Sequence, residues 1–293
     1  MLGKDFFVYW QIGRAVWSGV NPYSVPESLY PPAAIALFAV MSLPPFTIAF
    51  ATWTGINVAG FAYSLTRLVA ERRRLLWFAF PPTLFVLLTG QLDLLMLWAS
   101  TFLARGGYPA AVVAAVITMK PQAAFVLLPW YVLQWWKADR NTLWKVAAFT
   151  AILHLIPLAV SPGLYSDWIT SVRAQSAWRL EASPGLFALT SFGLPWPPIA
   201  LLAAFVTLYG LTRTRQTSYA TQLCSLPMGL WYESVFLAGV TPALLILPVA
   251  WLAFAAAALL RVSWPLAAVP IAALVWRWRK DRLALSAAKP LGS

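Results

Sequence analysis

Acids are so few in this chain that each can be considered as a catalytic group. The 293 residues include nine acids, 21 lysines and arginines and a single histidine. Asp5 stands directly before Phe6-Phe7-Val8-Tyr9, so a carboxylate precedes an aromatic helix. A carboxylate in such a position can act as a general base that takes a proton from an attacking hydroxyl group. A solvated terminal residue or a helix N-cap is the alternative for Asp5.

Three further polar residues interrupt apolar runs. Gln91 and Asp93 follow Gly90 between two such runs, and Lys120 stands before Pro121. A charge in apolar surroundings is costly unless it is paired or faces a cavity. Lys120 is therefore a candidate to bind an anionic leaving group, although its ammonium could instead reach out to an interface. Asp93 could line a cavity or interact with the dipole at a helix N-terminus.

Composition indicates whether the chain lies in water or in a membrane. Hydrophobic residues make up 61% of the chain and charged residues 10%, and the mean hydropathy is +0.72, which indicates an integral membrane protein. The net charge of +12 comes from short basic clusters between apolar runs, so we expect contact with anionic lipid and no binding of nucleic acid. The single Cys224 excludes an internal disulfide and a thiolate metal site.

The apolar runs predict an all-α, polytopic bundle of about nine to ten transmembrane helices. Residues 46–70 form the first full-length span, and 5–19 and 30–43 are expected to be interfacial or re-entrant helices on the outer face. One domain is expected over 1–285, with interfacial helices in 1–45, the transmembrane bundle in 46–285 and a short polar tail in 286–293. The later runs are 75–90, 92–103, 108–119, 122–136, 146–160, 195–211, 218–232, 234–260 and 263–275.

Basic clusters predict the orientation. Placing 71–74, 137–145 and 213–215 in the cytoplasm gives a consistent alternation of spans. Asp5, the 91–93 segment, Lys120 and the 161–194 loop then lie together on the outer face. The basic segment 277–282 should also be cytoplasmic, but it falls outside if every later run crosses once.

The motifs in this order resemble glycosyltransferase family 87, whose members are polytopic enzymes of the GT-C class. The resemblance covers roughly residues 5–136 and rests on Asp5-Phe6-Phe7-Val8-Tyr9, Gly19-Val20-Asn21-Pro22-Tyr23, Tyr30-Pro31-Pro32, Gly90-Gln91-Leu92-Asp93 and Met119-Lys120-Pro121.

The resemblance implies a hexosyltransferase that inverts the donor linkage. The expected donor is a polyprenyl-phosphate-linked hexose, usually mannose, and the expected acceptor is a lipid-linked or cell-envelope glycan. Transfer would take place on the outer face of the cytoplasmic membrane, with Asp5 as the general base. The lipid-phosphate sugar is a co-substrate, and no metal or other cofactor is expected.

Roles for the other candidates follow from the chemistry of the leaving phosphate and the sugar. Lys120 is expected to meet the phosphate, with arginines of the outer loop as secondary candidates, and Gln91 and Asp93 could bind sugar hydroxyls. Glu233 stands near a Pro/Trp motif where family members often place a histidine. Aromatic side chains could stack on the sugar or simply pack at the interface. The remaining candidates are Arg173, Arg179, Tyr9, Trp10, Tyr23 and Tyr30.

Two other classes of function compete with the enzyme. Family members usually carry a span before the catalytic acid, and they are usually longer, so the chain could be a truncated, non-catalytic membrane subunit whose partner supplies that span. Such a subunit should tolerate substitution of Asp5. A transporter is less favoured because the sequence shows no internal repeat.

Overall fold

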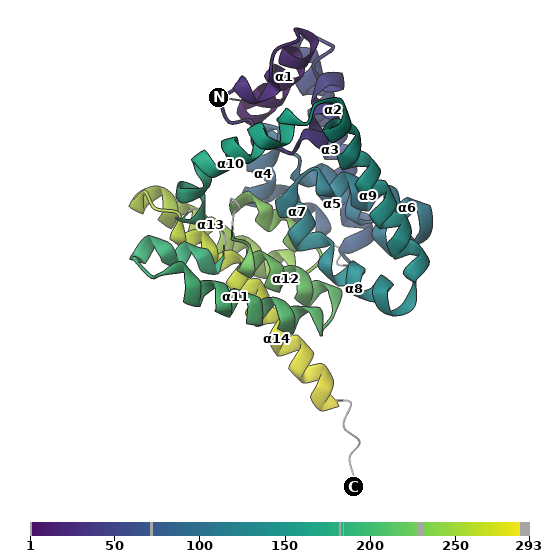
Figure 1. Ribbon diagram of the computed structural model, residues 1–293. Helices are drawn as coiled ribbons and strands as arrows, with labels where there is room; N and C mark the ends of the chain where they lie inside the picture. Colours follow the sequence, from purple (N-terminus) through teal and green to yellow (C-terminus); the bar gives the residue numbers. More distant parts are fainter. Residues whose placement is uncertain (1, 71–72, 182, 184, 228–230, 288–293) are drawn as a thin grey trace. The chain divides into compact units, whose positions relative to one another are not determined.

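The computed structural model describes residues 2–70, 73–181, 183, 185–227 and 231–287, and for 175–181 and 285–287 it describes the backbone alone. Within this part of the chain all regular elements are helices, apart from one isolated bridge between Ala238 and Thr241. The prediction of an all-α protein is confirmed (Figure 1). The chain folds into two compact units, and the prediction of a single domain over 1–285 is not tested by this division.

The first unit comprises Met1–Arg67 and Thr83–Trp178. Its helices pack in pairs, α1 against α2 and α6 against α9. They are α1 (Lys4–Trp17), η1 (Pro22–Ser24), α2 (Pro32–Met41), α3 (Phe46–Leu68), α4 (Pro81–Thr89), α5 (Asp93–Ser100), η3 (Leu103–Arg105), α6 (Gly107–Thr118), α7 (Pro121–Leu127), α8 (Pro129–Ala138), α9 (Arg140–Val160) and α10 (Gly163–Glu181).

The second unit comprises Leu68–Pro82 and Arg179–Ser293. Its centre is α12, which packs against both α11 and α14. The helices are η2 (Arg74–Ala79), η4 (Leu186–Phe192), α11 (Trp196–Leu211), α12 (Arg215–Ser225), η5 (Trp231–Leu237), α13 (Ala243–Leu260), η6 (Trp264–Ala267) and α14 (Ala268–Ala287).

Prolines begin several helices and divide runs that look continuous in sequence. Pro32, Pro121 and Pro129 each occupy the first turn of a helix, where the missing N–H costs no hydrogen bond. Pro129 splits the expected 122–136 span into α7 and α8. Runs judged by hydropathy alone therefore overestimate the length of individual helices.

Sharp bends shorten the candidate spans further. α2 and α3 meet at 113°, and α4 meets the following helix at 115°. In the described residues two helices, α9 and α13, are long and apolar enough to cross a membrane, or up to four spans exist if each bent pair counts as one. The protein is thus a helical membrane protein, whereas about nine to ten spans and the interfacial placement of α1 and α2 stay predictions.

Lipid-facing and packed surfaces are easily distinguished in the α6–α9 pair. α6 buries four alanines, which let the backbone of α9 approach closely. α9 in turn exposes Ile152, Leu155, Ile156 and Val160. A helix that leaves such large apolar side chains uncovered is suited to hydrocarbon and not to water.

α12 departs from the sequence prediction. The run 218–232 was expected to be an apolar span, but the helix covers Arg215–Ser225, is rich in Ser, Thr and Gln, and is buried from Thr217 onward. Gly210 of α11 allows this burial because a Cβ atom there would collide with the side chain of Thr221. The polar helix is therefore held inside its unit by α11 and α14.

Candidate functional site

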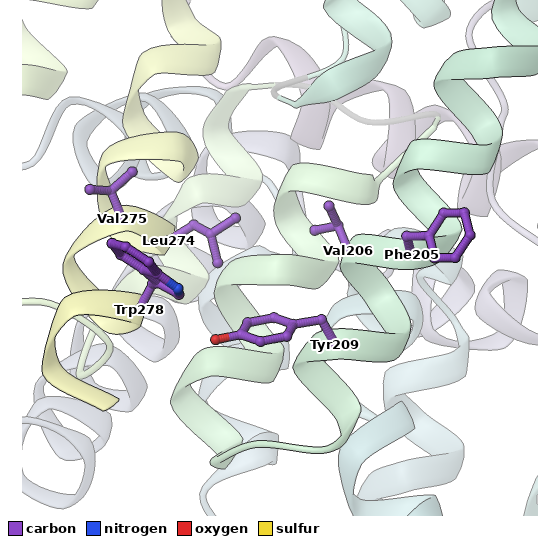
Figure 2. A pocket seen from close by; sticks show the side chains of 6 residues that line it. All are labelled: Phe205, Val206, Tyr209, Leu274, Val275 and Trp278. Atoms are coloured by element: carbon purple, nitrogen blue, oxygen red, sulfur yellow. The ribbon is translucent and has the colours of Figure 1, made fainter. Parts of the chain in front are cut away.

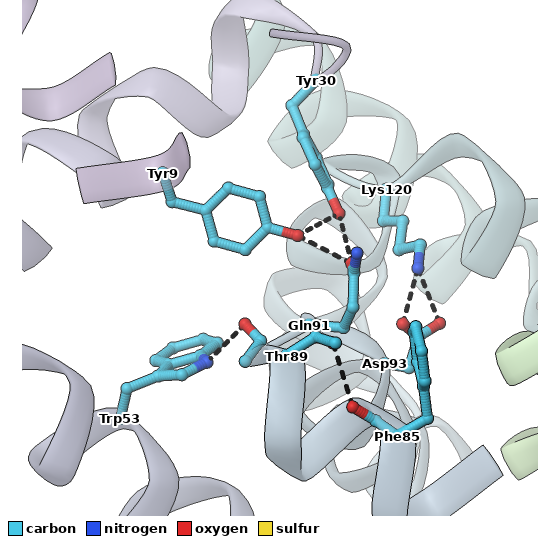
Figure 3. A network of polar contacts seen from close by, with 9 residues as sticks. Tyr9, Tyr30, Trp53, Phe85, Thr89, Gln91, Asp93 and Lys120 are labelled. Atoms are coloured by element: carbon cyan, nitrogen blue, oxygen red, sulfur yellow. Dashed lines mark hydrogen bonds and ion pairs between the residues drawn. The ribbon is translucent and has the colours of Figure 1, made fainter. Parts of the chain in front are cut away.

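The predicted polar residues of the first unit gather where α4 ends and α5 begins. The backbone turns at Gly90, whose φ of +81° favours glycine, and a Cβ atom there would lie 2.6 Å from Cβ of Phe6. The indole Nε1 of Trp53 donates to the carbonyl oxygen of Gly90 at 2.9 Å. These contacts fix the break between α4 and α5, which carries Gln91 and Asp93 (Figure 3).

Gln91 joins the break to the N-terminal segment. Its Oε1 accepts hydrogen bonds from the hydroxyls of Tyr9, at 2.7 Å, and Tyr30, at 3.0 Å, and the two hydroxyls lie 2.6 Å apart (Figure 3). Two hydroxyl hydrogens thus serve three short contacts. The cluster is nearly closed to solvent, since Gln91 is 6% and Tyr9 2% exposed. It orients α1 relative to the break through side chains far apart in sequence.

Asp93 and Lys120 form a buried ion pair beside this cluster. The ammonium Nζ donates to both carboxylate oxygens, at 2.7 Å and 2.6 Å, and the side chains are 0% and 3% exposed (Figure 3). Asp93 lies in the first turn of α5, and Lys120 precedes Pro121 at the start of α7. Two desolvated charges tolerate burial only as such a pair. The reading of Lys120 as a side chain that reaches an interface is therefore wrong.

Asp5 lies on α1, four residues before Tyr9, a spacing that puts both side chains on one face of the helix. It is half-buried and lies inside the first turn, whereas Gly3 is the N-cap, so the capping role considered for Asp5 is wrong. Its charge is the smallest of the influences that raise the pKa of the Tyr30 hydroxyl.

The electrostatics of the cluster favour a neutral Tyr30. The pKa of its hydroxyl is raised from the ordinary value near 10 to about 12. Burial is the largest cause, Lys120 opposes it, and the carboxylates of Asp93 and Asp5 add to it. The hydroxyl therefore remains a hydrogen-bond donor at physiological pH. The ring of Tyr9 stacks on Phe38 at 4.7 Å, which favours packing over sugar stacking for this residue.

The remaining candidates lie elsewhere. Arg173 is exposed on α10, a helix tied to the N-terminal loop by the hydrogen bond from Trp168 to the carbonyl oxygen of Leu29. The side chain of Arg179 lies outside the described residues. Glu233 is buried within the second unit, in η5. Arg179 and Glu233 belong to the second unit, and the other candidates belong to the first.

Two contacts at the site were missed by the sequence reasoning. Trp53 was not singled out, although an indole in the middle of a span, and not at its end, needs an acceptor for its N–H. The hydroxyl of Tyr23 donates to the carbonyl oxygen of Tyr30 at 2.7 Å and so holds the loop that carries it. Nowhere in the described residues do three or more His, Cys, Asp or Glu side chains come together as metal ligands would.

Comparison with known proteins identifies the chain at the level of its family. The model of glycosyltransferase family 87 matches residues 29–238. The match includes Tyr30, Gln91, Asp93 and Lys120, extends beyond the expected limit near residue 136, and begins after Asp5. The searches of curated proteins and of solved structures found no match. The chain belongs to glycosyltransferase family 87 and is a membrane glycosyltransferase.

Proposed function

We propose that the protein transfers a hexose, with mannose as the first candidate, from a polyprenyl-phosphate donor to a lipid-linked or cell-envelope glycan. The observation that carries this proposal is the convergence of four separate segments on one polar cluster. Tyr9, Tyr30 and Gln91 are hydrogen-bonded to one another, and the Asp93–Lys120 pair lies beside them. A sugar with several hydroxyls requires such a set of fixed donors and acceptors.

Asp5 is the proposed general base. The oxygen of the acceptor hydroxyl bonds to the anomeric carbon of the donor, on the face opposite the phosphate. The bond from that carbon to the phosphate oxygen breaks, and the polyprenyl phosphate leaves with the electron pair while Asp5 takes the hydroxyl proton. The half-buried position of Asp5, one helical turn from Tyr9, supports this assignment.

Lys120 is the proposed cation for the leaving phosphate. Its ammonium is held by both oxygens of the Asp93 carboxylate. Asp93 would hold Lys120 charged and oriented, and the phosphate would share that charge during transfer. Gln91 would then bind a sugar hydroxyl, and Arg173, Arg179 and Glu233 stay secondary candidates for substrate contacts.

The outer face of the cytoplasmic membrane is the proposed place of transfer. The sequence predicts that Asp5 and the 161–194 loop share one side of the membrane. In the structure much of the expected 161–194 loop is helical and forms α10 and η4. The amide of Asn21 donates to Asp167 of α10 at 2.7 Å, so the N-terminal segment contacts this region within the first unit. This contact supports a common side for the base and the loop.

A transfer assay tests the proposal. The purified protein in nanodiscs would receive a short-chain polyprenyl-phosphate mannose, with membrane extract as the acceptor. We expect Asp5→Asn to lower the rate about 100- to 10,000-fold, because an amide cannot take the proton. Glu27→Gln is a matched control, since Glu27 is an exposed carboxylate of the same segment, 3.5 Å from Lys4.

The outcomes separate the base from the enzyme as a whole. Asp5→Asn at the wild-type rate would remove Asp5 from the mechanism. Transfer by neither protein, with mannose and other hexose donors, would favour the non-catalytic subunit. In that case we expect a fixed protein partner to co-purify with wild type and with Asp5→Asn alike.

A further inference from the structure

An apolar groove runs between α11 and α14 in the second unit. Its volume is about 340 Å³, within the range of roughly 300–1,000 Å³ that is usual for small-ligand sites. Figure 2 shows side chains of the two helices facing each other across it. The lining residues are Phe205, Val206, Tyr209, Leu274, Val275 and Trp278. The surface of this lining is almost entirely apolar, so the groove is suited to a hydrocarbon chain.

An arginine lies over the ring of two aromatic residues that line the groove, Tyr209 and Trp278. Cζ of Arg213 lies 4.9 Å from the ring centre of Tyr209, and Cζ of Arg282 lies 5.0 Å from that of Trp278. Both arginines are exposed. Stacking uses the flat face of a guanidinium, whereas a phosphate is bound through its N–H edge, so the two interactions are compatible.

The charge is strongly positive at the end of the groove where Arg213 and Arg282 lie. The cations near it in sequence are Arg213, Arg215, Arg277, Arg279, Lys280 and Arg282. The acid among them is Asp281, whose carboxylate accepts from Thr217 at 2.7 Å and lies 3.3 Å from Arg277. An apolar groove that ends in such a basic cluster complements a lipid with an anionic headgroup.

A groove of the first unit repeats the arrangement. It lies between α3 and the α5–η3 segment, has a volume of about 320 Å³, and is lined by Ile56, Ala59, Gly60, Tyr63, Trp98 and Phe102. Arg67 lies over the ring of Tyr63 at 5.3 Å, and Arg105 over that of Phe102 at 4.6 Å. Both arginines are exposed. The same pairing of apolar lining, aromatic rim and stacked arginines thus occurs twice.

We propose that each groove binds an anionic glycerophospholipid of the membrane, with an acyl chain in the groove and the phosphate at its pair of arginines. The lipid is distinct from the sugar donor. Arg67 follows Trp53, which contacts the polar cluster, by 14 residues of α3, or about 20 Å along the helix axis. In the groove of the first unit, the arginines therefore lie far from the Asp93–Lys120 pair.

Native mass spectrometry of the detergent-solubilised protein tests the proposal, with dioleoyl phosphatidylglycerol and dioleoyl phosphatidylcholine offered in equal amounts. Wild type should retain phosphatidylglycerol at two sites. The Arg213→Gln/Arg282→Gln variant should bind it about 30-fold more weakly at one site, because each cation near an anionic headgroup contributes about 1 kcal/mol. Arg67→Gln/Arg105→Gln should lose the other site to the same extent.

Three further variants separate charge, space and stacking. Arg140→Gln is the matched control, since Arg140 lies over Trp136, which lines neither groove. Val206→Trp should fill the α11–α14 groove and displace the lipid while all arginines remain. Arg213→Lys/Arg282→Lys should keep most of the binding, because the charge is retained.

Three results would overturn the proposal. The first is equal retention of phosphatidylcholine, which lacks the net negative charge. The second is wild-type binding of phosphatidylglycerol by both double glutamine variants. The third is displacement of the retained lipid by an equal amount of short-chain polyprenyl phosphate, which would assign the groove to the donor.

Discussion

Buried polar side chains behave differently in the two units. In the first unit, the hydroxyls of Tyr9 and Tyr30 bond to Gln91 across more than 60 residues of chain. In the second, the hydroxyls of the buried α12 bond mainly to backbone carbonyl oxygens: Thr221 to Ser218 of the same helix and Ser225 to Ala203 of α11. Neither amide atom of Gln222, also in α12, has a hydrogen-bond partner among the described residues.

The difference teaches which polar groups have a defined orientation. A side chain that bonds to side chains of other segments fixes those segments relative to one another, and its loss leaves its partners unpaired. A hydroxyl that bonds to its own helix backbone fixes only its rotamer. The first unit therefore holds a preorganised cluster, as a site for transfer requires. In α12 the hydroxyl of Thr217, in the first turn, donates to Asp281 of α14, whereas Gln222 at its centre bonds to no side chain among the described residues.

Breaking the ion pair should have the largest effect on stability. Lys120→Met leaves the carboxylate of Asp93 buried without its counter-charge, at a cost of about 3–5 kcal/mol. The loss should appear as a lower midpoint of thermal unfolding in detergent. Asp93→Leu/Lys120→Met should recover most of it, because both charges are gone. A double variant as unstable as Lys120→Met would show that packing, and not the unpaired charge, sets the cost.

Substitution of Gln91 should come next. Gln91→Leu removes the acceptor of two hydroxyls, so we expect the free energy of unfolding to fall by about 1–3 kcal/mol. The transfer rate should fall as well, since α1 and Asp5 lose their link to the break. Chemical unfolding monitored by fluorescence measures the first effect. An unchanged stability would mean that the hydroxyls of Tyr9 and Tyr30 satisfy each other.

The matching substitution in α12 should differ in sign. Gln222→Leu removes a fully buried amide that has no partner in the described residues, so we expect stability to stay the same or rise by about 1 kcal/mol. The same unfolding measurement applies, and transfer should be unaffected. A loss comparable with that of Gln91→Leu would contradict the contrast between the units.

The sequence was a good guide to the members of the cluster and a poor one to their pairing. Asp5, Gln91, Asp93 and Lys120 were recognisable because polar groups are costly in apolar runs. That Lys120 faces Asp93 could not be read from spacing, since the two lie 27 residues apart on different helices. The polar burial of α12 was missed for a related reason, because burial by α11 and α14 is a tertiary effect.

The smallest expected effect concerns the protonation of Tyr30. Burial raises its pKa to about 12, while in the unfolded chain it is near 10. Between these values the folded protein keeps a proton that the unfolded chain has lost, so stability falls as pH rises through that window and is fully present below it. Tyr30→Phe has no such proton.

The stability advantage of wild type over Tyr30→Phe should therefore be constant from about pH 7 to 9 and shrink above about pH 10. Paired unfolding curves across this range measure it, and both proteins keep Tyr23, whose buried hydroxyl also has a raised pKa. A constant difference up to the highest pH would mean that the cluster does not favour the neutral hydroxyl.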